Sequence, residues 1–401
     1  MENKFICRLV QFFVKIGYYF IHYPNPKVVE GEGSLLKIPD LIKEDKLKKP
    51  LIVTDKGLFN LGVHIPLVEK LKEEGMPYAI FSDVFPNPTC ENVMNGYEVY
   101  KIEECDCIIA IGGGSPMDTA KTIGAKAARP KKDIRKFLGL FSVGKKIPML
   151  YAVPTTAGTG SEATIAAVIT DEKENHKIPI CDPALMPRRA ILDPKLTEGL
   201  PAFMTATTGM DALCHAVEAY TNHTYCTKYE NELCKKAVKL IYENILTVFT
   251  DGHNLEARKN MQFAAMYAGR AFSRGSVGYV HAIGHTLGGL YHIGHGEAMA
   301  IILPKVMRKY GKSAEKRLAE LASVVGIEGS NNTEKANKFI TWIEETNNAM
   351  NLKESFSQIK DEDIDTIVKW ALKESNPVYP CPQVWKYKDF YDMVLSLKEN
   401  N

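Results

Sequence analysis

Two short segments of the sequence place metal-ligating side chains at helical spacing. In TTGMDALCHAVEAY (207–220), which has no helix breaker after Gly209, Asp211 and His215 stand four residues apart. Side chains at that spacing project from one face of a helix, one turn apart. Together they could clamp a metal ion, although for this pair alone a metal-free Asp–His hydrogen bond is the simpler interpretation.

The second segment shifts the balance toward a metal. VHAIGHTLGGLYHIGHGEA (280–298) contains four of the ten histidines, namely His281 and His285 at i and i+4, then His292 and His295 after a glycine-rich turn. A buried imidazole must find partners for both ring nitrogens, so this density seldom serves packing alone. One Asp with three His is a ligand set that suits Fe²⁺ or Zn²⁺ and leaves a position for a substrate oxygen.

A glycine-rich turn offers a place for a phosphate group. GGGSPMDTAK (112–121) follows the apolar run CIIAI and opens an expected helix, with Pro116 near its first turn. Glycines let the backbone approach a phosphate closely, and the helix N-terminus presents unpaired N–H groups. The segment is neither a G-x-G-x-x-G fingerprint nor a Walker A motif, and by itself a plain tight turn explains it equally well.

Asp55 ends the strong apolar run in LIVTDKG. A carboxylate at the end of a buried strand can accept hydrogen bonds from the adenosine ribose hydroxyls, and it repels a 2′-phosphate. The position therefore favours NAD(H) over NADP(H), and the alternative is an Asp that only caps a loop. A further polar turn, PTTAGTGSEAT (154–164), is rich in hydroxyls and glycines between two expected strands.

The elements that must position these residues fall into two halves. Up to about residue 200, short apolar runs alternate with amphipathic segments such as 66–74 and 119–128, which is typical of buried parallel strands in an α/β domain. After Pro201, three-to-four-residue periodicity in Ala, Leu, Lys and Glu predicts a helical domain. The predicted strands are 50–55, 78–83, 107–114, 149–156, 166–170 and 190–194.

We therefore predict a Rossmann-like, dinucleotide-binding α/β domain over 1–200 and an all-α, metal- and substrate-binding domain over 201–401, with the active site in the cleft between them. Residues 1–25 form an apolar extension of the first domain. The run Phe5–Phe20 is interrupted by Arg8 and Lys15 and is shorter than a spanning helix. An amphipathic helix packed on the body or on a second subunit is expected rather than a spanning helix, and loose membrane association is the less favoured alternative.

The composition excludes some classes of function. A formal net charge of +2, with no block of Lys or Arg, does not indicate a basic surface of the kind that binds nucleic acid. The nine cysteines form no C-x-x-C pair, which argues against a zinc knuckle or a disulfide framework. Reduced thiols in a cytoplasmic protein are expected instead.

Several separate motifs, in the right order, resemble the iron-containing alcohol dehydrogenases. The motifs are TTGMDALCHAVEAY and VHAIGHTLGG…GHG, and the resemblance extends from VTDKG near residue 55 to the helices beyond 300. It implies a dehydroquinate-synthase-like architecture. It also identifies the four metal ligands as Asp211, His215, His281 and His295.

In that family the histidine that falls on His285 is not a ligand but lies by the substrate and can act in proton relay. The chain departs from the family pattern at two prolines, because Thr286 follows His285 and Gly294 precedes His295. The ligand identities survive this difference. The two missing prolines would instead change the shape of the pocket and of the loop that carries His295.

The same resemblance assigns the cofactor contacts. Gly114 and Ser115 would cradle the dinucleotide pyrophosphate, and Asp118 would lie near the nicotinamide end. Family members with Asp at the place of Asp55 prefer NAD. The remaining implied contacts are Thr155, Thr156 and Thr164 in the second cofactor loop, Lys177 on the ribose, and Asn87 in FPNPT against the adenosine side.

These residues together predict an NAD(H)-linked alcohol dehydrogenase or aldehyde reductase that uses Fe²⁺, or alternatively Zn²⁺. Hydride would pass between nicotinamide C4 and the carbon of a small alcohol or aldehyde whose oxygen binds the metal. Family members are commonly homodimers or larger assemblies. The alternatives are a dehydroquinate-synthase-type lyase or cyclase that uses NAD transiently, a metal hydrolase, and a non-catalytic dimer scaffold, against which the intact ligand set argues. The particular alcohol or aldehyde and the direction of the reaction stay open.

Overall fold

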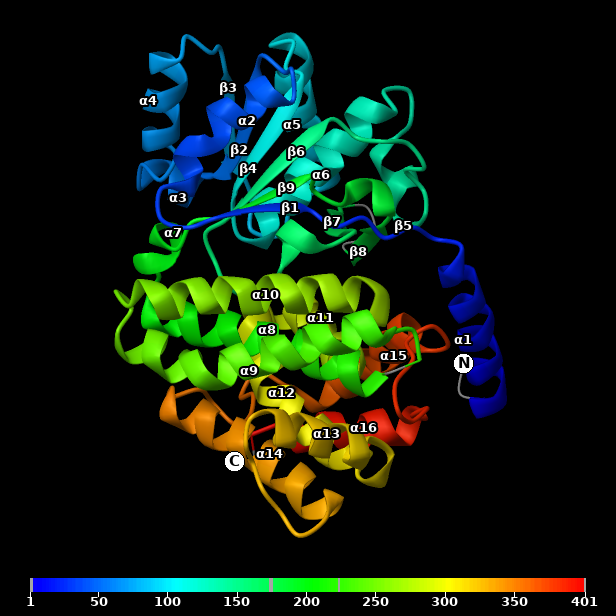
Figure 1. The fold of residues 1–401 in the computed structure, drawn as a ribbon. Helices are drawn as coiled ribbons and strands as arrows, with labels where there is room; N and C mark the ends of the chain where they lie inside the picture. Colours follow the sequence, from blue (N-terminus) through cyan, green and yellow to red (C-terminus); the bar gives the residue numbers. More distant parts are fainter. Residues whose placement is uncertain (1–2, 173–175, 223, 400–401) are drawn as a thin grey trace. The chain divides into compact units, whose positions relative to one another are not determined.

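The computed structural model describes residues 3–172, 176–222 and 224–399 of the chain. The chain divides into two compact units, which are described separately (Figure 1). One unit is His22–Leu200. The other combines Pro201–Asn401 with Met1–Ile21.

A six-stranded parallel sheet forms the centre of unit His22–Leu200. Its strand order is β1 (Lys27–Glu30), β9 (Arg189–Leu192), β6 (Met149–Pro154), β4 (Cys107–Gly112), β2 (Pro50–Asp55) and β3 (Ala79–Val84). The central strand β4 is buried at every position, which explains why it reads as a continuous apolar run. The predicted Rossmann-like parallel sheet is confirmed.

Helices cover both faces of this sheet. Alternate residues of β2 enter different cores: Leu51 and Val53 belong to one apolar cluster, and Ile52 belongs to the other. The first cluster includes side chains of α5 (Cys90–Ile102) and α6 (Gly114–Ala128). The second includes side chains of α2 (Ile38–Glu44) and α4 (Ile65–Glu73). The shorter helices of the unit are α3 (Lys56–Asn60) and α7 (Lys195–Glu198).

The prediction that 166–170 is another strand of the parallel sheet is wrong. This segment is β7 (Ala166–Asp171), which pairs antiparallel with β8 (His176–Cys181) in a separate sheet that also contains β5 (Gly139–Leu140). Burial alternates along β7, so only one of its faces is covered. A run of four apolar residues and a threonine does not indicate which face will be buried, and only the pairing of the strand decides it.

The helical unit is built around one buried helix, α8 (Ala202–Asn222), and the predicted helical domain is confirmed. Nearly every residue of α8 from Thr205 onward is buried, because it packs against α9, α10 and α12 on different sides. The further helices of the unit are α9 (Lys228–Thr250), α10 (Leu255–Gly275), α11 (Tyr279–Tyr291), α12 (His295–Tyr310), α13 (Lys312–Val324), α14 (Asn332–Ala349), α15 (Ile364–Ser375) and α16 (Tyr387–Leu397).

The N-terminal helix α1 (Lys4–Tyr19) groups with the helical unit, although the sequence analysis counted it with the α/β domain. Hydrogen bonds from its polar side explain the difference. Arg8 Nη2 donates to the backbone oxygen of Pro382 (2.9 Å), and Gln11 Nε2 donates to that of Tyr379 (2.8 Å). Among the described residues, no helix combines the length and the apolar character needed to cross a membrane.

A buried lysine ties α6 to the segment between β6 and β7. Lys121 Nζ donates to Ser161 Oγ (2.8 Å), to Thr164 Oγ1 (2.8 Å) and to the backbone oxygen of Ala166 (2.8 Å). Ser161 Oγ in turn donates to Asp118 Oδ1 (3.1 Å). Burial lowers the pKa of Lys121 to about 8 and raises that of Asp118 to about 6, so both groups carry charge at neutral pH.

Replacing Lys121 by Met should therefore destabilise the α/β unit. The substitution keeps the length of the side chain but leaves the Asp118 carboxylate and three oxygen acceptors buried without a donor, which should cost about 3–5 kcal/mol of unfolding free energy. Urea unfolding measures this loss. Lys101→Met, at a side chain that is 64% exposed, is the control and should change the free energy by less than about 0.5 kcal/mol. Equal urea midpoints for the two variants would contradict the role of Lys121.

Candidate metal centre and cofactor edge

Three helices of the helical unit bring four ligating side chains to one point. Helix α8 supplies Asp211 and His215, α11 supplies His281, and His295 is the first residue of α12. One ligating atom from each of the four lies within 4.8 Å of every other. The structure thus brings together the four residues that the sequence analysis named as ligands.

The spacing of these atoms fits a single metal ion. Asp211 Oδ1 lies 3.3 Å from His295 Nε2, 3.8 Å from His215 Nδ1 and 3.9 Å from His281 Nε2. Two ligand atoms that bind a common ion at ~2.1 Å are separated by roughly 3–4 Å. Asp211 Oδ1, His215 Nδ1 and His281 Nε2 are buried and have no hydrogen-bond partner among the described residues. Polar atoms that are buried and unpaired in this way are costly unless a cation satisfies them.

The charges of the cluster suit a metal as well. Burial alone would raise the pKa of Asp211, but His215, His295 and His281 outweigh it and hold that pKa well below its usual range. Burial lowers the pKa of His215 to about 3 and shifts that of His281 in the same direction. Near neutral pH Asp211 is therefore ionised and the imidazoles of His215 and His281 are neutral, which are the forms that bind metal.

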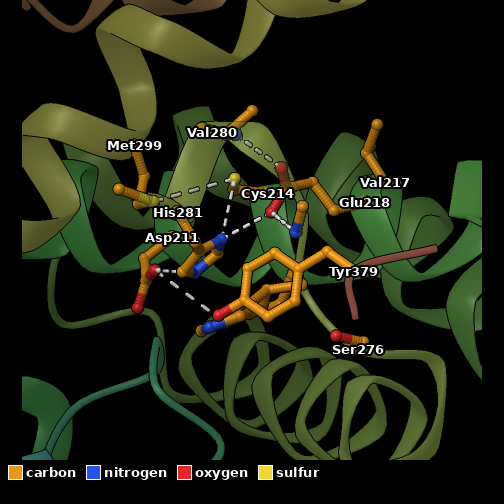
Figure 2. Close-up of polar contacts among 12 residues, drawn as sticks. Asp211, Cys214, Val217, Glu218, Ser276, Val280, His281, Met299 and Tyr379 are labelled. Atoms are coloured by element: carbon orange, nitrogen blue, oxygen red, sulfur yellow. Dashed lines mark hydrogen bonds and ion pairs between the residues drawn. The ribbon is translucent and has the colours of Figure 1, made fainter. Parts of the chain in front are cut away.

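A second buried carboxylate fixes the orientation of one ligand (Figure 2). His281 Nδ1 is 2.6 Å from Glu218 Oε2, and Glu218 also accepts the backbone N–H groups of Gly278 and Val280. A carboxylate beside Nδ1 keeps the proton on that nitrogen and leaves the Nε2 lone pair facing Asp211. Burial raises the pKa of Glu218 to about 7 despite the two backbone donors.

A competing set of three residues shares His281. Cys214, Glu218 and His281 also lie close enough for a common ion. Burial, with Glu218 nearby, raises the pKa of the Cys214 thiol well above its usual value, so the sulfur keeps its proton and is a poor ligand. Its Sγ lies 3.8 Å from His281 Nδ1 and 3.9 Å from Met299 Sδ (Figure 2). The group around Asp211 is the better metal site.

Close packing of two helices sets the position of His295. This residue was predicted to lie in a loop, but it begins α12. A Cβ atom at Gly296 would clash with the backbone oxygen of Thr207 in α8, so only glycine lets the two helices approach so closely at this position. The helical start of α12, rather than a flexible loop, carries the fourth ligand.

His285 lies beside the cluster but outside the group of four. Its ring stacks on that of His295 with centroids 5.4 Å apart, and its Nδ1 is 2.8 Å from Glu374 Oε1. Tyr379 donates its hydroxyl to the same carboxylate oxygen (3.0 Å). The His285 side chain is 31% exposed, whereas that of His281 is 2% exposed, so His285 can exchange protons with the surroundings more readily.

The α/β unit gathers most of the predicted cofactor residues at one edge of its parallel sheet. The carboxyl ends of β2, β3, β4 and β6 meet there, and the strand order reverses between β2 and β4, where such sheets commonly bind nucleotides. Gly112 at the end of β4 has a φ of 153°, and a Cβ at this position would clash with Pro116. The residues at this edge are Asp55 at the end of β2, Asn87 after β3, Gly114 and Ser115 after β4, and Thr155 and Thr156 after β6.

The three remaining predicted cofactor residues are Asp118, Thr164 and Lys177. Asp118 accepts from Ser161 Oγ and from the backbone N–H of Val168, and Thr164 is buried against Lys121, so both have partners within the unit. Their cofactor roles stay predictions. Lys177 lies in β8, and its side chain is outside the described part of the structure.

Asp55 fits both of the interpretations that the sequence left open. Its Oδ1 accepts from the backbone N–H of Leu58 (2.9 Å) and so caps α3. A carboxylate has further acceptor capacity on its second oxygen. Capping therefore does not exclude a contact with a ribose.

Glu218, Glu374 and Lys121 were not among the functional residues predicted from the sequence. The sequence did contain a signal for Glu218. This residue follows Asp211 by seven positions and His215 by three, so it lies on the same helix face. Lys121 stood at the end of the quoted GGGSPMDTAK motif. Glu374 is 89 residues from His285, and no local pattern links the two.

Comparison with known proteins agrees with these observations. Residues 25–194 match the sequence family described as "Iron-containing alcohol dehydrogenase", and residues 205–394 match "Fe-containing alcohol dehydrogenase family, C-terminal". NAD-dependent methanol dehydrogenase of Bacillus methanolicus is 36% identical to this chain over 360 residues, which cover 88% of this chain and 94% of that protein. 1,3-Propanediol dehydrogenase of Klebsiella pneumoniae is 38% identical over 335 residues, which cover 82% and 86%.

A solved structure agrees along almost the whole chain. A crystal structure of 1,3-propanediol oxidoreductase aligns with a TM-score of 0.90 at 34% identity, covering 94% of this chain and 100% of that chain. Both units are thus similar to known structure.

Replacing Glu218 by Gln should weaken metal binding. The amide keeps the shape of the side chain but no longer holds the proton on His281 Nδ1, and loss of such a partner typically lowers metal affinity 10–100-fold. Competition with a chromogenic chelator measures the affinity directly, without an activity assay. The matched control is Glu320→Gln, because Glu320 also contacts α8 but through the Tyr220 hydroxyl. Unchanged affinity in the Glu218 variant would contradict the assignment.

Proposed function

Because the chain belongs to the iron-containing alcohol dehydrogenase family, we propose that it interconverts a small alcohol and its aldehyde, with NAD(H) as the hydride carrier and a divalent metal as cofactor. The resemblance noted in the sequence is confirmed. The observation that carries the proposal is the cluster around Asp211, in which three buried ligating atoms lack hydrogen-bond partners among the described residues.

Asp211, His215, His281 and His295 would hold the metal. Fe²⁺ is the ion that the family name indicates, and the same set of one carboxylate and three imidazoles also suits Zn²⁺. When bound, the ion supplies Lewis acidity toward the oxygen of an alcohol or aldehyde. The ionised Asp211 would offset part of the positive charge of the ion. Glu218 would keep the His281 ring in the tautomer that offers Nε2 as a ligand.

His285 would handle the proton of the substrate hydroxyl. With Glu374 as the acceptor for Nδ1–H, Nε2 would exchange the proton with the substrate. The partly exposed side chains of His285 and Glu374 give that proton a path to solvent. Tyr379 holds the Glu374 oxygen through its hydroxyl, so the carboxylate stays next to the ring.

The sheet edge of the α/β unit would hold the dinucleotide. Gly114 and Ser115 at the start of α6 present backbone N–H groups for the pyrophosphate. Asp55 favours NAD(H) over NADP(H), and the relative from Bacillus methanolicus is named as NAD-dependent. Asn87, Thr155 and the other predicted contacts complete the proposed site.

Small alcohols and aldehydes are the proposed substrates. Relatives are named for methanol and for 1,3-propanediol, and both of these are short alcohols. The homodimer or larger assembly and the cytoplasmic location that the family implies are part of the same proposal.

An assay of the purified protein tests the activity. The protein is prepared without oxygen, loaded with Fe²⁺ or Zn²⁺, and mixed with NAD⁺ and short alcohols or with NADH and short aldehydes. Steady formation or consumption of NADH supports the proposal. Product formation with no net change in NADH would indicate a cyclase or lyase that uses NAD transiently, and activity without NAD would indicate a hydrolase.

Substitutions of His281 and His285, which lie one turn apart on α11, should distinguish a metal ligand from a proton carrier. His281→Ala should lose both the metal and turnover, because it removes one of four ligands. His285→Ala should keep the metal and lower kcat by about 10²–10⁴-fold, the usual contribution of a general acid or base. Metal content by mass spectrometry and kcat are measured on the same samples. Loss of metal from the His285 variant, or its full retention by the His281 variant, would reverse the two roles.

Asp55→Asn should relax the choice of cofactor. Asparagine keeps an oxygen that can cap Leu58 N–H but removes the negative charge that would repel a 2′-phosphate. The ratio of kcat/KM for NADP⁺ to that for NAD⁺ should rise by about tenfold or more, as expected for removing one charge near a phosphate. Glu73→Gln, at a side chain that is 67% exposed, should leave the ratio unchanged. An unchanged ratio in the Asp55 variant would mean that the residue only caps α3.

A further inference from the structure

The N-terminal helix α1 presents a broad apolar face that nothing else in the described chain covers. Phe5 is 74% exposed, Phe13 is 62% exposed, and Phe20, directly after the helix, is 84% exposed. Such exposure of large aromatic side chains is uncommon on a protein surface. The full set of exposed large apolar residues in this segment is Phe5, Ile6, Leu9, Phe12, Phe13, Ile16, Tyr19 and Phe20.

These residues share one side of the helix. Phe5, Leu9, Phe12, Ile16 and Tyr19 follow one another at spacings of four and three residues, which forms a continuous stripe along an α-helix. Ile6, Phe13 and Phe20 widen the stripe on one side. Since each aromatic side chain offers roughly 150–250 Å² of surface, the face exceeds the ~300–600 Å² of the largest apolar patch on a typical monomer.

The opposite side of α1 is fastened to the helical unit. Cys7 and Gln11 are buried there, and Gln11 Nε2 donates to the backbone oxygens of Pro377 and Tyr379. Arg8 donates to the backbone oxygen of Pro382 and to Gln11 Oε1. The arrangement inverts that of an ordinary surface helix, because the polar groups face the protein and the apolar groups face outward.

Charge indicates which partner fits this face. The charged residues between Asn3 and Phe20 are Lys4, Arg8 and Lys15, and there is no acidic residue among them. At about 100° per residue, all three fall on the same flank of the apolar stripe. The helix thus combines an aromatic face with a basic border, which is the pattern of helices that lie in the surface of an anionic membrane.

A second copy of α1 is a poorer match for the same face. In an antiparallel two-fold pair the two basic flanks would lie side by side, and like charges would repel. In a parallel two-fold pair each basic flank would face the flank that contains Val10 and Gly17, which carries no acidic group. Neither arrangement supplies a negative charge, whereas phospholipid headgroups do.

We propose that α1 docks the protein on the surface of an anionic lipid membrane. The apolar stripe lies at the boundary between headgroups and acyl chains, and Lys4 and Lys15 contact phosphates. The helix does not span the membrane, in agreement with its length of 16 residues.

Vesicle flotation of the full-length protein tests the proposal. The vesicles contain equal amounts of phosphatidylglycerol and phosphatidylcholine, or phosphatidylcholine alone. The protein should float with the anionic vesicles, at least ~10-fold less with the neutral ones, and less at 0.5 M than at 0.1 M NaCl. Phe12→Ser combined with Phe13→Ser should reduce binding at least ~100-fold. Lys4→Glu with Lys15→Glu should reduce it at least ~10-fold.

The substituted side chains are exposed, so the variants should keep the unfolding midpoint of the parent protein. Leu61→Ser, at a leucine that is 78% exposed in the α/β unit, is the matched control and should bind vesicles like the parent. Absence of binding by the parent protein, equal binding to neutral vesicles, or binding that survives the Phe12 and Phe13 substitutions would overturn the proposal. Light scattering is recorded in parallel, and a dimer that the same substitutions dissociate, without vesicle binding, would show that a second copy is the partner instead.

Discussion

A buried, ionised carboxylate at the centre of the helical unit is the constraint on which the candidate active site depends. Asp211 lies on α8, which is covered on nearly all sides. A carboxylate in such a place is costly unless positive or hydrogen-bonding partners surround it. Three imidazoles from three helices converge on it, and α11 and α12 must pack against α8 at the positions that allow this convergence.

The cluster is held in place by contacts that lie outside it. Glu218 fixes the His281 ring through Nδ1 and is itself held by two backbone N–H groups at the start of α11. Gly296 permits the close approach of α12 to α8 that places His295. Ligands on packed helices lose little conformational entropy on binding, since their side chains are already oriented.

The two units position their candidate site residues in different ways. In the α/β unit, parallel strands end at one edge, and the loops that follow them carry the candidate cofactor residues. In the helical unit, the important side chains project from helix faces at i, i+4 and i+7 spacing. The α1 helix belongs to the helical unit in space but is separated from it in sequence by the entire α/β unit.

The sequence by itself determined the fold class and, through motifs that resemble the iron-containing alcohol dehydrogenases, the family and the four clustered side chains. Spacing alone left His285 and His292 as further candidates for ligands. Periodicity identified α8, and Asp211 and His215 had to share a face of it whatever the surroundings. Glycine-rich turns after apolar runs likewise marked the sheet edge. Such signals depend only on residues a few positions apart.

Only the tertiary structure decided which elements meet. It placed β7 in a separate antiparallel sheet, made His295 the start of a helix, and joined His285 to Glu374 across 89 residues. It also buried Lys121 among oxygens contributed by a distant loop, and it turned the apolar side of α1 outward. Each of these depends on pairing or packing between distant segments, and local residue patterns do not encode which distant segment will be the partner.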